Sequence, residues 1–399
     1  MNLLSRLPAP VRRTVHGVVG VALVAALASC GNQDTYPLTT LSPKGQQADT
    51  IHTLVKPIFI IAGVVFVVVQ VVIVVIVIKF RRRRGEEHGE NDPVQIHGNT
   101  PLELTWTALP AILLAGLAVL NVQTIFKLEQ RVPDAIHVDV YGQQWWWEYR
   151  YDLDSDGQPD IITANQMVVP AGRQVELNIR SRDVIHSFWI PALNGKMDAS
   201  PGSTHFMAIN ANKPGIYEGQ CTEFCGLSHG YMRMEVKALT PADYDQWVTD
   251  QTASPAEPGN KLAEEGRTAF LSQCAYCHQV NGLTAEGEYS DAGPVADYKG
   301  LDGKAVPTVR PGVAPNLTHL MSRERFSGNM FPLHYEDGKP DEGNLKDWLT
   351  DPKAMKPMMP DNQQGMPNLN LDPATIDALV AYLVTLNGPN GSKDQHDDR

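Results

Sequence analysis

Four side chains that bind soft metals lie close together in the stretch QCTEFCGLSHGYM. Cys221 and Cys225 are four residues apart, and His229 and Met232 follow within the next seven residues. Upstream, His186 stands in the segment VIHSFWIP, at the end of a strand-like run. Thiolate, imidazole and thioether groups suit copper or zinc and not the metals that prefer oxygen ligands. The sequence therefore predicts a copper or zinc site.

The number of thiolates separates the candidate metals. A single blue copper takes two histidines, one cysteine and a weak axial methionine, so one thiolate would be left over here. Zinc accepts two cysteines and two histidines, but it has no use for a methionine three residues after the last ligand. Two cysteines on one loop can instead bridge two copper ions, which leaves one histidine for each ion. The pattern favours a copper pair over either single-metal site.

A second site follows in the motif CAYCH. Cys274 and Cys277 with the adjacent His278 form the attachment signature for a c-type haem, which has two thioether links and one axial ligand. A thioredoxin-like motif would need a βαβ context, whereas the residues around 263–271 predict a helix. A zinc knuckle would need a second cysteine pair, which the sequence does not offer. The motif therefore predicts covalent haem c.

The metal-ligand loop resembles the copper A loop of cytochrome c oxidase subunit II, which lies on a cupredoxin domain. The resemblance covers residues 54–247 and includes two membrane spans. It implies that Cys221 and Cys225 are bridging thiolates and that His186 and His229 are terminal ligands.

The same resemblance implies roles for residues that spacing alone would not single out. Met232 and the backbone carbonyl of Glu223 would be weak copper ligands, and the Glu223 side chain would bind magnesium at the boundary with subunit I. Trp145, the first tryptophan of GQQWWWEYRY, would be exposed above the copper and receive the electron. Glu103 would lie at the mouth of a proton channel in subunit I.

The tail resembles the cytochrome c domains fused to some bacterial oxidase subunits. There a Met-Pro pair precedes the last helix, which implies Met366 as the second axial ligand of the haem iron. Met359 is the alternative, because it also precedes a proline and the sequence carries a short insertion with this second Met-Pro pair. Pro315 would accept a hydrogen bond from the free ring nitrogen of His278 and fix its orientation.

Two apolar segments predict a transmembrane hairpin. One, at about 56–79, is almost free of polar residues, and the other lies at about 103–126. A buried helix of a soluble protein is the alternative for the second segment. Lys79 and the arginines at 81–84 place the connecting loop in the cytoplasm, so both metal sites are expected on the outer side.

The N-terminus predicts export. Arg6, Arg12 and Arg13 precede an apolar run that ends in LASC, which resembles a bacterial lipobox with Cys30 as the lipidated residue. A short membrane helix with an incidental cysteine is the alternative. One cysteine for lipid, two for copper and two for haem account for all five in the chain.

These features predict a multi-domain protein with a transmembrane hairpin, an all-β cupredoxin-like domain and an all-α class I cytochrome c domain. Period-two patterning after 131 favours an antiparallel sandwich or barrel, and Asp372 with Pro373 predicts the start of the last helix. The expected divisions are a lipoprotein signal peptide at 1–29, an N-terminal segment with two spans at 30–130, the copper A domain at 131–248, a linker at 249–259, the cytochrome domain at 260–388 and a polar tail at 389–399.

The resemblance implies subunit II of a cytochrome c oxidase in a bacterial inner membrane. An external donor, such as cytochrome c or the bc complex, would reduce haem c, and electrons would pass through copper A to subunit I, which holds haem a and copper B. Oxygen reduction and proton pumping would occur there, with subunit III as a further partner.

A membrane-tethered carrier outside an oxidase is the alternative. Quinol oxidase subunits lack the copper ligands, and nitrous oxide reductase needs a large propeller domain. The net charge of −12 argues against nucleic acid.

Overall fold

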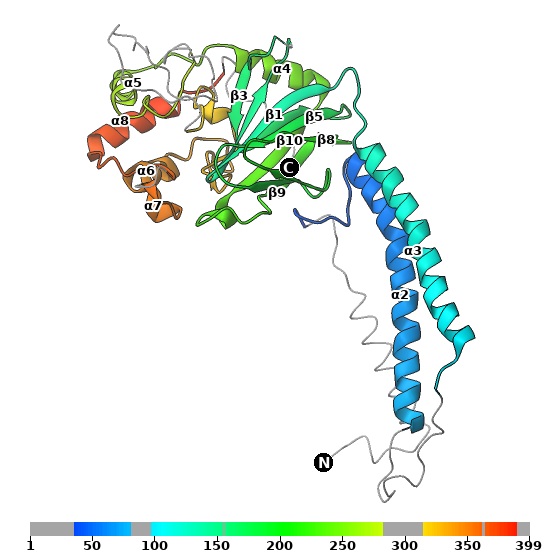
Figure 1. Cartoon of the computed structure of the whole chain (residues 1–399). Coiled ribbons are helices and arrows are strands. Elements are labelled where there is room, and N and C mark those ends of the chain that lie inside the picture. The colour runs from blue at the N-terminus through cyan, green and yellow to red at the C-terminus, as the bar shows by residue number, and fades with distance from the viewer. Residues whose placement is uncertain (1–35, 81–96, 155, 282–313, 361–363, 389–399) are drawn as a thin grey trace, which may run out of the picture.

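The computed structural model describes residues 36–80, 97–154, 156–281, 314–360 and 364–388. Two long helices extend from one side of a central sheet domain, and a smaller helical domain lies on the other side (Figure 1). The expected signal peptide, Cys30, the arginines at 81–84 and the polar tail lie outside the described residues.

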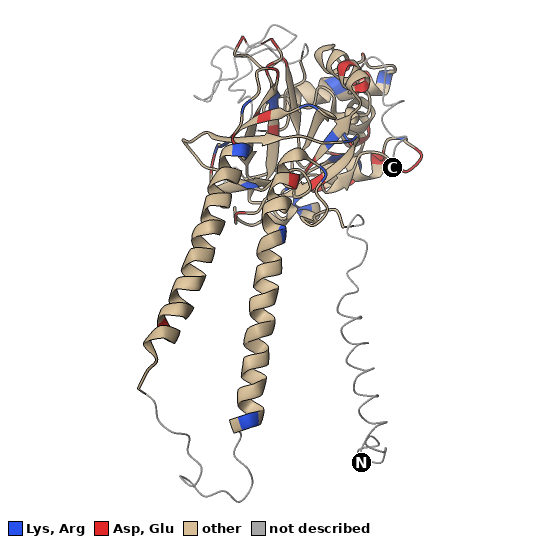
Figure 2. Cartoon of the chain, turned by 90° about the vertical axis from the view of Figure 1, so that its right-hand side faces the viewer, with Lys and Arg blue, Asp and Glu red and all other residues tan. Residues whose placement is uncertain are grey.

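The two long helices are α2 (Gln46–Phe80) and α3 (Thr100–Leu128), which both extend away from the sheet domain and carry few charges along their length (Figure 2). Their large apolar side chains are exposed, and both helices are long and apolar enough to cross a membrane. Both helices are longer than the predicted spans. The first turn of α2 is fixed to the sheet domain, since the amide of Ala48 donates to the carbonyl of Leu193 over 3.0 Å.

The sheet domain contains two main sheets with strand orders β3-β2-β1-β5-β8 and β4-β10-β9, and a two-stranded sheet β6-β7. Its strands are β1 (Ile136–Gln143), β2 (Trp146–Tyr151), β3 (Ile161–Ala164), β4 (Gln166–Pro170), β5 (Val175–Ser181), β6 (His186–Trp189), β7 (Lys196–Ala199), β8 (His205–Ile209), β9 (Gly215–Gln220) and β10 (Arg233–Leu239). The sandwich is mixed and not purely antiparallel, because β1 runs parallel to β5 and β4 runs parallel to β10. Parallel neighbours cannot be joined by a hairpin, so intervening strands make these crossovers.

The helical domain is built on α5 (Lys261–Gln273), α6 (Glu342–Thr350), α7 (Pro352–Met355) and α8 (Pro373–Leu383), with a short hairpin of β11 (Arg325–Phe326) and β12 (Phe331–Pro332). The predicted start of the last helix is confirmed, since the Asp372 carboxylate accepts hydrogen bonds from the amides of Ala374 and Thr375. The first residues of the expected linker instead belong to α4 (Pro241–Thr252), which packs on the sheet domain.

Helices α5 and α8 pack closely enough to require a glycine between them. A Cβ atom at Gly266 would lie 1.8 Å from the carbonyl oxygen of Ala378 and 2.8 Å from the Cβ of Tyr382. Phe270, one turn further along α5, is fully buried and contacts the ring of Tyr382. The position of Gly266 therefore sets the distance between the two helices of this domain.

We expect Gly266→Ala to destabilise the helical domain by about 1–3 kcal/mol or more, because backbone and not a flexible side chain obstructs the added methyl group. Thermal unfolding of the purified protein, followed through the spectrum of the bound haem, measures the loss. Gly259→Ala is the control, since a Cβ there meets no atom within 4 Å. Equal melting temperatures for the two variants would contradict this account of the packing.

Candidate metal centres

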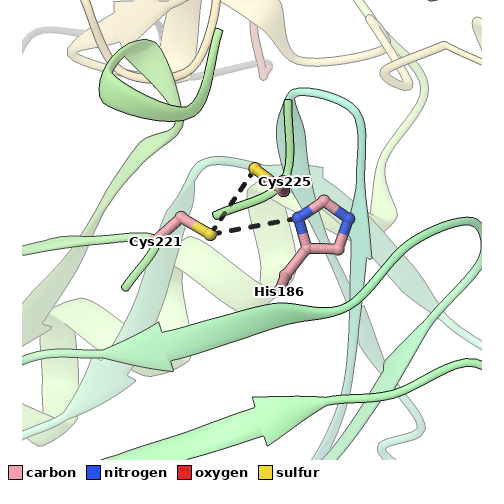
Figure 3. A group of neighbouring side chains, drawn as sticks. All are labelled: His186, Cys221 and Cys225. Atoms are coloured by element: carbon pink, nitrogen blue, oxygen red, sulfur yellow. Dashed lines mark hydrogen bonds between the residues drawn. The ribbon is translucent and has the colours of Figure 1, made fainter. Parts of the chain in front are cut away.

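The first centre lies on the loop between antiparallel strands β9 and β10. The amide of Cys221 donates to the carbonyl of Met232 over 2.9 Å, so the two ends of the loop are joined directly. His186, the first residue of β6 in the two-stranded sheet β6-β7, lies beside this loop with its ring toward the cysteine sulfurs (Figure 3). The geometry brings together the ligand residues that the sequence had separated by more than thirty positions.

Five predicted ligand atoms converge at this loop. The sulfurs of Cys221 and Cys225 lie 3.8 Å apart, far longer than the roughly 2.05 Å of a disulfide, and both thiols are free. His186 Nδ1 lies 3.9 Å from the Cys221 sulfur. On the opposite side, His229 Nδ1 and Met232 Sδ lie 3.5 and 3.8 Å from the Cys225 sulfur. Each cysteine therefore has its own imidazole.

The placement of a different imidazole near each cysteine shows whether the residues fit a copper pair. Two adjacent sulfurs, each within 4 Å of a different imidazole, match two ions bridged by thiolates, whereas one tetrahedral ion would gather all four ligands around a single point. The backbone carbonyl of Glu223 lies 3.3 Å from the Cys221 sulfur, and Met232 lies at the other end. The residues present therefore fit two copper ions better than a single zinc ion.

A neighbouring carboxylate orients the buried imidazole. Asp183 Oδ1 lies 2.8 Å from His186 Nε2, which directs Nδ1 toward the sulfurs, as carboxylates beside metal-binding histidines commonly do. Burial opposes protonation, but bonds to Asp183 and Cys221 outweigh it and raise the pKa of His186. The hydrogen bond between the two thiols lowers the pKa of Cys221, with help from His186, and the same contact raises the pKa of Cys225. The deprotonated thiolate is the form of cysteine that binds metal.

Trp145 has a different environment from the expected one. Its side chain is only 2% exposed, although the resemblance predicted exposure above the copper. Its indole Nε1 donates to the carbonyl of Cys225 over 3.0 Å. The helical domain covers it, since Lys356 Nζ donates to the Trp145 carbonyl over 2.7 Å and Met358 belongs to the same buried cluster. The expectation of exposure was therefore wrong, because it did not include the second domain.

Glu103 has a local structural role. Asn99 caps α3 by accepting a hydrogen bond from the amide of Leu102, and the Glu103 carboxylate accepts one from the amide of Asn99 over 3.1 Å. This reciprocal arrangement resembles a capping box. Helix capping alone therefore accounts for a carboxylate at this position.

The second centre lies at the end of α5. Cys274 is the C-cap residue of that helix, Cys277 and His278 follow in the next turn, and neither cysteine is in a disulfide. His278 Nδ1 donates to the carbonyl of Pro315 over 2.9 Å, at the position that the sequence analysis expected. Burial lowers the pKa of His278, so its Nε2 is available as a neutral ligand.

The buried side chain of Arg323 bears on whether this domain fits a haem. Its side chain is buried, and its Nε has no hydrogen-bond partner in the described part of the chain. Burial lowers its pKa to about 10. A buried guanidinium is costly without an anion, and a carboxylate of a bound haem would supply one. The sequence did not single out Arg323, because the stretch APNLTHLMSRER holds two arginines and nothing in it shows which one is buried.

The two candidate methionines, Met366 and Met359, and the neighbouring Met358 occupy different environments. Met366 packs against the cores of both domains, and Trp348 Nε1 lies 3.1 Å from its sulfur. Met359 is 38% exposed, whereas Met358 is buried in the core of the sheet domain. Contact with the core that contains Cys274 therefore favours Met366 as the haem ligand.

Comparison with known proteins places these sites in a family. Three family models match in succession: "Cytochrome C oxidase subunit II, transmembrane domain" at 39–124, "Cytochrome C oxidase subunit II, periplasmic domain" at 152–239 and "Cytochrome c" at 263–387. Cytochrome c oxidase subunit 2 of Alkalihalophilus pseudofirmus is 33% identical over 360 residues, which are 88% of this chain and 91% of the relative. This chain belongs to the cytochrome c oxidase subunit II family.

Other members support the full-length match. Cytochrome c oxidase subunit 2 of Bacillus sp. strain PS3 is 36% identical over 377 residues, which cover 90% of this chain and 94% of that protein. Quinol oxidase subunit 2 of Bacillus subtilis is 34% identical over 292 residues, covering 70% of this chain and 83% of the relative. The matches confirm the predicted fold class, and they imply copper A and haem as the cofactors of this oxidase subunit.

Gly142 leaves room for the His186 ring, and we expect Gly142→Ala to weaken copper binding. An added Cβ would lie 2.9 Å from His186 Cδ2 and 3.1 Å from the Trp147 ring, so the imidazole must move. Copper affinity should fall by roughly 10–100-fold, as for other changes that disturb ligand orientation. Competition with a chelator measures it. Gly230→Ala is the matched control, because its Cβ meets nothing within 4 Å; equal affinities would contradict the prediction.

Proposed function

We propose that this subunit takes electrons from an external donor through its own cytochrome domain and delivers them through its copper loop to haem a of subunit I. Oxygen is then reduced to water in subunit I, coupled to proton pumping. The observation that carries the proposal is the presence of a convergent copper-ligand loop and a haem-attachment motif in one chain, in domains that contact each other. The Cys225 carbonyl is hydrogen-bonded to Trp145, and Trp145 is hydrogen-bonded to the cytochrome domain through Lys356.

The proposed ligands of the haem are Cys274 and Cys277 as thioether links, with His278 and Met366 on the iron and Pro315 orienting the histidine. The proposed copper ligands are His186, Cys221, Cys225, His229, Met232 and the carbonyl of Glu223. When bound, the two cofactors supply one-electron redox chemistry. The protein holds the ligands rigidly and excludes water, since both copper-binding sulfurs are at most 3% exposed.

The loop also offers a surface for subunit I. Phe224 is 77% exposed and Leu227 is 53% exposed, an apolar pair beside the copper ligands that suits burial against another protein. The exposed Glu223 side chain lies on the same loop, which supports its proposed role on magnesium at that boundary. We further propose that Glu103 faces the mouth of a proton channel of subunit I, and that subunit III and an external cytochrome complete the assembly.

The proposed topology places both metal domains outside a bacterial inner membrane, with the basic loop at 81–84 in the cytoplasm and a lipid on Cys30. The two apolar helices and the family matches support a membrane protein with an outer-side domain. Alkaline phosphatase fusions at the loop and at the C-terminus distinguish this orientation from its reverse.

We expect Cys221→Ser in the purified oxidase to abolish the mixed-valence copper signal in electron paramagnetic resonance and to leave the haem c spectrum intact. An external donor should still reduce the haem, while oxygen consumption falls to background, because delivery to subunit I requires the copper pair. Ser203→Ala, in the same domain but outside the ligand loop, is the control. Oxygen consumption at the wild-type rate in Cys221→Ser would refute the proposed order of carriers.

The choice between the two methionines predicts different spectra. Met366→Ala should remove the sixth ligand, convert the haem c from low spin to a five-coordinate or water-bound form and lower its midpoint potential, since a methionine ligand raises that potential. Met359→Ala should leave both properties unchanged. Optical spectra of the oxidised and reduced oxidase measure the outcome, and the reverse pattern would identify Met359 as the ligand.

A further inference from the structure

The insertion that carries the second Met-Pro pair lies against the copper domain. Lys356, just before the pair, is 4% exposed although it is a lysine. Its Nζ donates to two backbone carbonyls, that of Trp145 at 2.7 Å and that of Ser327 at 3.4 Å. Trp145 belongs to the copper domain and Ser327 to the cytochrome domain. One lysine Nζ therefore joins the backbones of the two domains.

The next residues of the insertion continue this contact. The Ser228 hydroxyl, buried beside the copper ligand His229, donates to the carbonyl of Pro357. Met358 is 3% exposed and packs in the cluster that contains Trp145 and Cys225. An apolar side chain from the cytochrome domain thus completes the core of the copper domain.

Two glutamines connect the haem-methionine segment to the copper loop. Gln364, two residues before Met366, donates through Nε2 to Gln144 Oε1 over 2.8 Å. Gln144 in turn donates through Nε2 to the carbonyl of Cys225 over 2.6 Å. A continuous path of side chains and hydrogen bonds therefore runs from the segment of the proposed haem ligand to a proposed copper ligand.

A second zone of contact has the character of a permanent interface. Arg233 donates through its amide to the carbonyl of Gly328 over 3.0 Å, and Asn329 Nδ2 donates to Glu235 Oε2 over 3.0 Å. Lys237 and Glu324 form a 2.8 Å ion pair whose side chains are both less than 10% exposed. Separating the domains would break these bonds, and the polar groups would lose partners they have at present.

We infer that Lys356, Met358 and Gln364 form a fixed dock that positions the haem-methionine segment against the copper loop. These are positioning residues that act through Trp145 and Gln144, and their role rests on the proposed direction of electron transfer. The dock gives the insertion a function: it replaces a diffusing or swinging cytochrome by one held at a single orientation over Cys225.

Lys356→Glu in the intact oxidase complex tests the dock. A carboxylate would then face the two carbonyl oxygens that Lys356 Nζ binds. The ratio of docked to undocked protein should therefore fall about tenfold or more. Hydrogen–deuterium exchange at the Arg233 amide, which is bonded across the interface, should accelerate by a similar factor. After flash reduction of the haem, electron transfer to copper should slow, with the spectra of both centres unchanged.

Lys353→Glu is the matched control, because it makes the same charge change on α7 at an exposed position. Gln364→Leu is a milder second variant that removes only the glutamine bridge, and it should slow electron transfer even if Lys356→Glu does not assemble. Exchange and transfer rates equal to those of Lys353→Glu in both dock variants would overturn the inference. Absence of haem-to-copper transfer in the wild-type complex would instead refute the proposed function, while amide exchange would still measure the dock.

Discussion

Two cysteine sulfurs held 3.8 Å apart, close but unbonded, set the requirement that the rest of the copper domain meets. Holding the two sulfurs at this distance requires a rigid loop. The hydrogen bond from the Cys221 amide to the Met232 carbonyl and the pairing of β9 with β10 supply that rigidity. The ligands can then bind a metal pair with little further rearrangement, because folding has already restricted the conformations of the loop.

A buried cluster of three charged side chains extends this rigidity to His186 on β6. Glu148 on β2 accepts from Arg182 over 2.8 Å and from Arg150 over 2.6 Å. Burial alone would raise the pKa of Glu148, but the two guanidinium groups outweigh it and hold the pKa below its ordinary value. Arg182 immediately precedes Asp183, which orients His186. The charge cluster therefore fixes the segment that delivers the imidazole, and loss of one partner would leave a buried charge unpaired.

The sequence predicted most completely what depends on local spacing. A loop of cysteines, histidine and methionine and the motif CAYCH carry their ligands within a few residues, and the apolar face of α8 follows from helical period. Strand direction was not predictable in this way, since alternation reports which face is buried and not which strand is the neighbour. The burial of Trp145 and Lys356 was missed for a related reason: it depends on a contact between residues more than two hundred positions apart.

The connection between the domains shows why a fixed arrangement is physically reasonable. A flexible tether alone would raise the local concentration of the cytochrome domain but leave its orientation free. Here the connection after α4 is itself bound, since the carbonyl of Ala253 lies 3.0 Å from His319 Nε2 and the amide of Ala256 donates to the carbonyl of Asn387. Ordering the linker costs conformational entropy, and burying Met358 in the same interface offsets part of that cost. Once the linker is ordered, little further entropy is lost in holding the glutamine bridge, so contacts that would be weak between separate proteins can persist within this chain.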